Sequence, residues 1–243
     1  MCTVSYLPLS QTDYILTSNR DETVDRPSAL PINQYLIGER MVYYPKDQQA
    51  GGTWIATTGN DVTLCLLNGG FEPHFVPEGH LYRKSRGTVL LDFFHYEHAD
   101  AYIESYDFSN IEPFTLIVIE TVNTLTVLRE LRWSGAQLTV TSMNASEPHI
   151  WSSVTLYSKT VREQRQTWFQ NWLDRQHTFT QNEILQFHRF AGEGNPNHDL
   201  IMQKGNRRTV SICSIERIEG LTTAVYVDLK KEETSNYLVY HTC

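Results

Sequence analysis

Met1-Cys-Thr-Val-Ser-Tyr6 and Ser18-Asn-Arg-Asp-Glu22 are the two stretches from which the fold and the site of this chain can be predicted. If Met1 is removed, Cys2 becomes the N-terminal residue and carries both a thiol and a free α-amino group. A free thiol titrates at pH ~8.5 and an α-amino group at ~7.7–8.0, so the amine can accept the thiol proton and later return it. The pairing predicts an N-terminal nucleophile. The alternative is that Met1 stays and Cys2 is a small buried residue at the end of a strand.

Asp13–Ser18 has a strand-like composition and would place Arg20 and Asp21 beside the strand that begins at Thr3. A guanidinium next to a thiol lowers the thiol pKa, so Arg20 is the candidate that holds Cys2 as a thiolate. Asp21 would anchor the α-ammonium group or the arginine. The alternative interpretation of these polar residues is an ordinary charged turn after a strand.

The remaining sequence alternates between groups of strands and pairs of helices. Strand patterns cover residues 3–9, 13–18, 35–44, 53–58, 62–67, 114–120, 125–127, 137–141, 209–215, 222–229 and 237–240, and helix patterns cover 86–94, 99–106, 158–175 and a segment from 180. In the third helix Val161, Phe169 and Trp172 share an apolar stripe, and Arg165 is predicted to lie away from it. Segregated runs of this kind predict an α+β fold, a four-layer αββα sandwich, in one domain spanning 1–243.

Composition excludes several classes of function. The formal net charge of −8 and the absence of long Lys/Arg clusters argue against nucleic-acid binding. No apolar run approaches eighteen residues and no signal peptide is recognisable, so we expect no membrane span and a cytoplasmic location. The four cysteines are scattered without zinc-site spacing, which predicts free thiols, no metal and no cofactor.

Five landmarks occur in a fixed order, and together they resemble the NRDE family, also called transport and Golgi organisation 2-like proteins. The landmarks are Met1-Cys2, Ser18–Glu22 followed by Arg26-Pro27, Gly51-Gly-Thr-Trp54, Leu67-Asn68 and Ser85-Arg-Gly87. The resemblance is clear over about the first half of the chain. It implies the αββα fold of N-terminal-nucleophile hydrolases and a more distant similarity to cysteine acylases that cleave penicillin V and conjugated bile salts.

The resemblance also implies roles for individual residues. Cys2 matches the nucleophile and Arg20 the arginine beside it, whereas the aspartate of the acylases lies farther beyond the arginine than Asp21 does here. Asn68 matches the side chain that helps to form the oxyanion hole, where an amide N–H stabilises developing negative charge. The alternative for Asn68, which precedes Gly69, is a turn-forming Asn-Gly pair.

Two further site residues are implied in the second half of the chain, both as substrate-binding residues. Ser153 stands where relatives commonly have an asparagine, and its hydroxyl is shorter and donates only one proton. Arg207 in Gly205-Asn-Arg207 resembles the arginine of a Gly-Thr-Arg motif, and a surface salt bridge is its alternative role.

Two functions from different classes follow. The first is an N-terminal-nucleophile amidohydrolase that cleaves a non-peptide amide or thioester of a small-molecule substrate through an acyl-Cys2 intermediate. The second is a non-catalytic carrier or chaperone of a hydrophobic ligand, such as haem, a lipid or acyl-CoA, on the same scaffold. Cys2→Ala separates them, because it would abolish turnover but leave equilibrium ligand binding intact.

Overall fold

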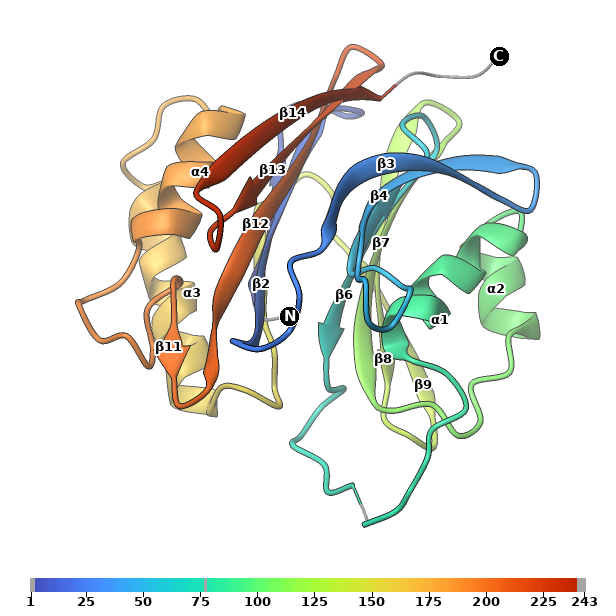
Figure 1. Ribbon diagram of the computed structural model, residues 1–243. Helices are drawn as coiled ribbons and strands as arrows, with labels where there is room; N and C mark the ends of the chain where they lie inside the picture. Colours follow the sequence, from blue (N-terminus) through green and yellow to red (C-terminus); the bar gives the residue numbers. More distant parts are fainter. Residues whose placement is uncertain (1–2, 77, 240–243) are drawn as a thin grey trace.

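Two antiparallel sheets occupy the centre of the molecule (Figure 1). The structure is a computed structural model that describes residues 3–76 and 78–239. Sheet A has the order β10-β1-β2-β12-β13-β14, with β11 beside β12. Its strands are β1 (Thr3–Pro8), β2 (Tyr14–Thr23), β10 (His149–Ser152), β11 (Gln203–Lys204), β12 (Arg207–Ile218), β13 (Leu221–Asp228) and β14 (Glu233–Val239).

Sheet B has the order β3-β4-β5-β6-β7-β8-β9, so its strands lie in chain order. They are β3 (Leu30–Ile37), β4 (Arg40–Lys46), β5 (Ile55–Thr57), β6 (Val62–Asn68), β7 (Phe114–Val122), β8 (Leu125–Trp133) and β9 (Leu138–Met143). The helices are α1 (Arg86–Asp92), the 3-10 helix η1 (Phe93–His95), α2 (Ala99–Ser105), α3 (Lys159–Leu173) and α4 (Gln181–Phe190). None of the described helices is long and apolar enough to cross a membrane.

Alternation along the strands produces three apolar layers between four structural layers. In β1, Val4 and Tyr6 pack between the sheets, whereas Leu7 packs under α3 and α4. On the far side, α1 and α2 cover sheet B through a cluster that includes Val89 and Phe93. Figure 1 shows the resulting order of helices, sheet, sheet and helices. The predicted four-layer α+β sandwich is confirmed.

The local predictions differ from the structure in three instructive places. The pattern at 35–44, which is compatible with one or two strands, corresponds to two strands, β3 and β4, joined at Gly38 with φ 58°, and β3 begins earlier than predicted, at Leu30. The short strand β10 was not predicted, and it pairs with β1 at the edge of sheet A. Arg165 was predicted to lie away from the apolar stripe of α3, and this is wrong, because its side chain is fully buried.

A β-bulge interrupts the pairing of β2 with β12. Asp21 pairs with Thr209 and Arg20 pairs with Ser211, so Val210 is the extra residue. The bulge allows Thr209 to face the α3–α4 layer while Ser211 faces sheet B. The side chains of Thr209 and Ser211, two positions apart in sequence, therefore lie on opposite faces of sheet A.

Candidate functional site

A cleft opens at one end of the sandwich, where β2 and β6 end and α1 begins. Its empty volume is about 630 Å³, and it is lined by residues from both sheets. Six charged side chains line it: Arg20, Glu22, Arg26, Asp47, Arg86 and Glu112. Two of the predicted site residues, Arg20 and Asn68, are brought together there.

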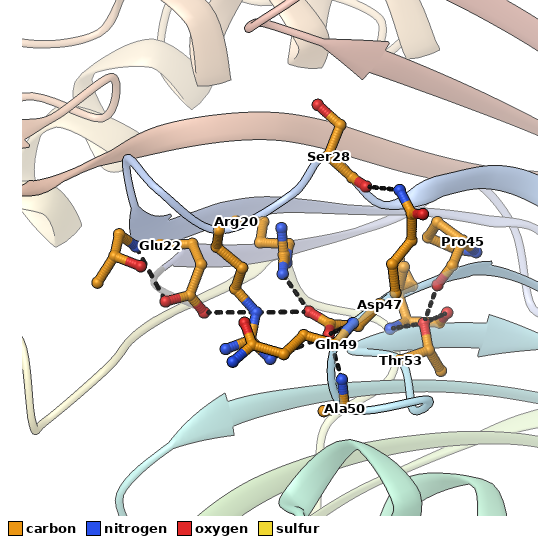
Figure 2. Close-up of polar contacts among 12 residues, drawn as sticks. Arg20, Glu22, Ser28, Pro45, Asp47, Gln49, Ala50 and Thr53 are labelled. Carbon is orange, nitrogen blue, oxygen red and sulfur yellow. Dashed lines mark hydrogen bonds and ion pairs between the residues drawn. The ribbon is translucent and has the colours of Figure 1, made fainter.

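Arg20 points from β2 into the space between the sheets. Its side chain is buried and forms an ion pair with Asp47 (Figure 2). Its guanidinium carbon also lies 4.7 Å from the centre of the Trp54 ring. Trp54 belongs to the Gly51–Trp54 landmark, so two landmarks far apart in sequence meet at this contact. A cation held between a carboxylate and an indole face is fixed in both position and orientation.

Asp47 is the carboxylate that pairs with both Arg20 and Arg26. It was not among the site residues predicted from the sequence. Arg26 binds it through Nε at 2.8 Å and a terminal nitrogen at 2.9 Å, and the backbone N–H groups of Gln49 and Ala50 donate to it at 3.0 and 2.8 Å (Figure 2). Burial alone would raise its pKa, but hydrogen bonds from Arg26 and Ala50 together with the charges of Arg20 and Arg26 hold the pKa below its usual value. The carboxylate is therefore ionised across the neutral range.

Asp21 faces the opposite side of β2 from Arg20. Its carboxylate accepts hydrogen bonds from the hydroxyls of Tyr157 and Thr209, the latter at 2.5 Å. The predicted contact of Asp21 with the α-ammonium group falls on residues outside the described part of the chain. Arg20 is instead paired with Asp47, so the carboxylate that orients the arginine comes from the loop after β4.

Asn19 links β2 to α4. Its amide nitrogen donates to the carbonyls of His188 and Leu200, and its Oδ1 lies 2.7 Å from Nδ1 of His188. Nε2 of His188 lies 2.7 Å from the Ser5 hydroxyl, so Nδ1 carries the proton and Nε2 accepts from Ser5. These are the residue types of a catalytic triad, but all three are fully buried under α4, which makes this a structural link.

Arg165 fixes the start of β1. It donates to the Thr3 hydroxyl at 2.5 Å and to the carbonyls of His198 and Asp199, and its guanidinium lies 3.7 Å from the centre of the Tyr157 ring. Thr3 is the residue that follows Cys2 in the sequence. Cys2 itself lies outside the described residues.

Asn68 ends β6 and lines the cleft, and within the described residues its side-chain amide makes no hydrogen bond. Gly69 follows with φ 86°, and a Cβ there would lie 2.5 Å from Cγ2 of Val154. The buried Ser153 donates to the Asn68 backbone carbonyl at 2.8 Å. Asn68 therefore begins a tight turn at the cleft, and Ser153 supports it through the backbone.

Arg207 is a predicted site residue that lies outside the lining of the cleft. It begins β12, pairs with Thr23 and is half-buried. Its charge is nevertheless felt by Arg86, whose pKa is lowered by burial and further by Arg207, while Glu112 acts in the opposite direction. Arg207 thus adds positive potential at the rim.

Two glycines join the cleft walls. A Cβ on Gly52 would lie 2.4 Å from the carbonyl carbon of Gly87, and a Cβ on Gly87 would lie 2.7 Å from the oxygen of Thr53. The backbone N–H of Thr53 also donates to the Gly87 carbonyl at 3.2 Å. The Gly51–Trp54 and Ser85–Gly87 landmarks are therefore the two halves of one backbone contact. Among residues 3–76 and 78–239, no group of His, Cys, Asp and Glu side chains could hold a metal ion.

Comparison with known proteins places the chain among relatives of this architecture. The sequence model of the family described as Transport and Golgi organisation 2 matches residues 1–237. No curated protein matches the sequence.

Solved structures with a similar fold include three hydrolase chains. An N-acylethanolamine-hydrolyzing acid amidase ortholog from Caenorhabditis elegans superposes with a TM-score of 0.62 at 11% identity, covering 88% of this chain and 92% of its own. A mutant conjugated bile acid hydrolase from Clostridium perfringens gives 0.53 at 10% identity, covering 100% and 98%. Another variant of that hydrolase gives 0.54 at 11%, covering 99% and 98%. At such identities the likeness shows the fold alone, and it confirms the predicted N-terminal-nucleophile hydrolase fold.

Proposed function

The chain belongs to the Transport and Golgi organisation 2 family, and from this premise we propose that it is an N-terminal-nucleophile hydrolase. It cleaves a non-peptide amide or thioester of a small molecule through an acyl-Cys2 intermediate, after Met1 has been removed. The C. elegans relative is named for hydrolysing N-acylethanolamines and the bacterial relative for hydrolysing conjugated bile acids. The first is named as an amidase and the second as a hydrolase, which supports the reaction class proposed here.

One observation carries this proposal: a cation and a free amide converge next to the start of β1. Thr3 pairs with Asn19, the neighbour of Arg20, and Arg20 and Asn68 line one cleft. The Cα atom of any residue bonded to Thr3 lies about 3.8 Å from the Cα of Thr3. The proposal therefore requires the thiol at position 2 to face the cleft and to reach Arg20 and Asn68.

In the acylation step, the α-amino group of Cys2 takes the thiol proton and the thiolate attacks the carbonyl carbon of the substrate. A carbon–sulfur bond forms, and the carbonyl oxygen becomes an oxyanion that accepts a hydrogen bond from the amide of Asn68. The α-ammonium group then returns the proton to the leaving nitrogen or sulfur. The carbon–nitrogen or carbon–sulfur bond to the leaving group breaks, which leaves acyl-Cys2.

In the deacylation step, the α-amino group accepts a proton from water, and the hydroxide attacks the acyl carbon. The bond to the Cys2 sulfur breaks, the carboxylic acid leaves, and the thiol recovers its proton. Arg20 supports both steps, because a fixed positive charge favours a neighbouring thiolate over the thiol. Asp47 keeps Arg20 in place.

The test is intact-mass analysis of the full-length chain after exposure to an activated acyl thioester. We expect a chain without Met1 to gain one acyl group at Cys2, and Cys2→Ala to gain none. Asn68→Ala should label at the same residue about 100-fold more slowly, because one oxyanion donor is lost. A chain that keeps Met1, or that labels first at another cysteine, would remove the mechanism.

The remaining cysteines provide matched controls. Cys65 and Cys213 are free and buried, and burial raises the pKa of the Cys65 thiol to about 12 and that of Cys213 also upward. Cys65→Ala should therefore label like the unmodified chain. Cys243→Ser tests the thiol nearest the C-terminus, which lies outside the described residues.

The polar lining of the cleft favours the hydrolase over the carrier. A carrier of haem or a lipid is expected to bury its ligand against apolar side chains. Here three arginines and three carboxylates line the cleft. Binding of haem or acyl-CoA that persists in Cys2→Ala, without turnover in the unmodified chain, would support the carrier instead.

A further inference from the structure

A second pocket is lined by Leu67, the residue before Asn68, and by Ser153. Its empty volume is about 470 Å³, and it is bounded by the start of α3, by β10, by the start of β7 and by the end of β8. We call it the Arg162 pocket and define it by its polar lining residues Thr115, Arg132, Ser152, Ser153, Arg162 and Gln166. Ser153 joins the two hollows, because it lines this pocket and donates to the Asn68 carbonyl at 2.8 Å.

The charges of the pocket are not balanced. Arg132 is neutralised by Glu130, which it binds through Nε at 2.7 Å and a terminal nitrogen at 2.9 Å. Arg162 forms no ion pair within the described residues, and its Nε is buried without a hydrogen-bond partner. No carboxylate side chain is among the described residues that line the pocket. The lining therefore carries one positive charge in excess.

A partly buried cation with an unpaired donor is costly unless an acceptor satisfies it. The planar fork of an arginine matches two oxygens of a carboxylate or a phosphate, and serine hydroxyls add single donors. From the pocket, its excess charge and the unpaired Nε, we propose that the Arg162 pocket binds a small oxyanion, either a carboxylate or a phosphate group. Arg162 is its main ligand, and the hydroxyl of Ser152 is available beside it.

The test measures thermal stability of the full-length chain in potassium phosphate, potassium acetate and potassium chloride at one pH and matched ionic strength. A ligand that binds only the native state raises Tm in a saturable way. We expect phosphate or acetate to raise Tm beyond chloride and to give saturable heat in a calorimetric titration. Arg162→Gln should weaken that binding about tenfold or more, because a charge-assisted hydrogen bond is lost.

Matched variants separate a bound ion from a general effect of charge. Lys159→Gln removes a charge from the same helix at a side chain that is 83% exposed, so it should bind the ion like the unmodified chain. Arg162→Lys keeps the positive charge but loses the planar guanidinium group. Its affinity for the ion should therefore lie between that of Lys159→Gln and that of Arg162→Gln. Circular dichroism checks that each variant is folded.

The ion that binds shows whether the natural ligand group is a phosphate or a carboxylate. A response to phosphate alone assigns a phosphate group, and a response to acetate alone assigns a carboxylate. If neither ion gives saturable binding to the unmodified chain, or if Arg162→Gln binds as well as the unmodified chain, the pocket is not an oxyanion site. None of these results depends on the acyl chemistry of Cys2, because the ions are not hydrolysed.

Discussion

Arg165 shows how a single side chain can hold the interior of this protein together. It is fully buried in α3, and its charge is met by two backbone carbonyls, the Thr3 hydroxyl and the face of Tyr157. The hydroxyl of Tyr157 in turn donates to the buried Asp21. The positive charge of Arg165 and the negative charge of Asp21 are thus bridged by one aromatic ring.

Replacing Arg165 with an uncharged residue should strongly destabilise the protein. Arg165→Met leaves Asp21 buried without its compensating cation and leaves two carbonyls unsatisfied, so we expect the free energy of unfolding to fall by about 3 kcal/mol. Urea denaturation at pH 7 measures it. Arg175→Met, at an exposed position just beyond the same helix, should change stability by less than ~0.5 kcal/mol. Equal effects of the two variants would contradict this account.

At the scale of residues, the resemblance to the family predicted more of the cleft residues than the periodicity of apolar residues did. Arg20 and Asn68 lie in landmarks and Ser153 was implied by the family resemblance; in the structure Arg20 and Asn68 line one cleft, and Ser153 donates to the Asn68 carbonyl. Asp47 carried no signal, because an aspartate before a Gly-rich turn is commonplace and its partners come from a different sheet. The burial of Arg165 depends on loop carbonyls that helical periodicity does not register.

At the scale of elements, the contact between the loop before β5 and the start of α1 forms one wall of the cleft. Gly52 and Gly87 are packed backbone against backbone, and Ser85 caps α1 by accepting from the N–H of Thr88. Side chains of any size at either glycine would push the two segments apart. This wall of the cleft therefore requires glycine at both positions, because neither has room for a Cβ atom.

Two effects oppose each other in Gly87→Ala. Helix propensity favours alanine by about 1 kcal/mol. However, the new Cβ would lie 2.7 Å from the Thr53 oxygen and 3.0 Å from the Thr53 nitrogen, and backbone atoms cannot turn aside as a side chain can. Overpacking costs about 1–3 kcal/mol, so we expect a net loss of stability by chemical denaturation.

Gly51→Ala is the control for backbone strain alone. Gly51 adopts φ 73°, but a Cβ there meets nothing within 4 Å. It should cost about 1 kcal/mol and leave Cys2 labelling unchanged, whereas Gly87→Ala should also slow labelling. An increase in stability on Gly87→Ala would mean that the two segments can separate freely.

The elements themselves were largely readable from the sequence. The β5–β6 hairpin, the N-terminal hairpin and all four helices were predicted, because each has a strong period or a turn signal. β10 was missed because it has only four residues, and three of them are only half-buried, so no alternation is visible. Its position next to β1 could not be inferred from local pattern.

At the scale of the whole molecule, the link between Ser5, His188 and Asn19 ties sheet A to the helix layer and makes global stability depend on pH. Burial lowers the pKa of His188 to about 3, and the charge of Arg165 acts in the same direction. The hydrogen bond that Nε2 of His188 accepts from the Ser5 hydroxyl requires the neutral imidazole, because protonated Nε2 has no lone pair to accept with. Protonation is therefore resisted in the folded state but not in the unfolded state.

The sign of the pH effect follows from this difference. The unfolded histidine binds a proton below pH ~6.5, so the contribution of His188 is fully present above that pH and is lost as the pH falls toward 3. Between pH 7 and pH 5 the loss should be about 2 kcal/mol. Urea denaturation at pH 7, 6 and 5 should show that His188→Gln has a shallower dependence than the unmodified chain. His177→Gln, at an exposed position, should follow the unmodified chain.

The number of layers was predictable for the whole molecule, but the assignment of strands to sheets was not. Runs of strands separated by helix pairs indicate two covered sheets. Sheet B consists of one uninterrupted stretch of chain, from β3 to β9, whereas sheet A is built from both ends of the chain. Pairing between distant segments, such as Arg20 with Ser211, leaves no trace in local periodicity.

The assignment of strands to the two sheets also determines the order in which the sheets can form during synthesis. Sheet B pairs neighbours in sequence, so its contacts can close as soon as β9 has left the ribosome, whereas β1 and β2 must wait for β10 and β12. Until then, both edges of the first hairpin remain unpaired. The residue proposed as the nucleophile would thus be synthesised first, whereas the strands that flank the first hairpin are synthesised late.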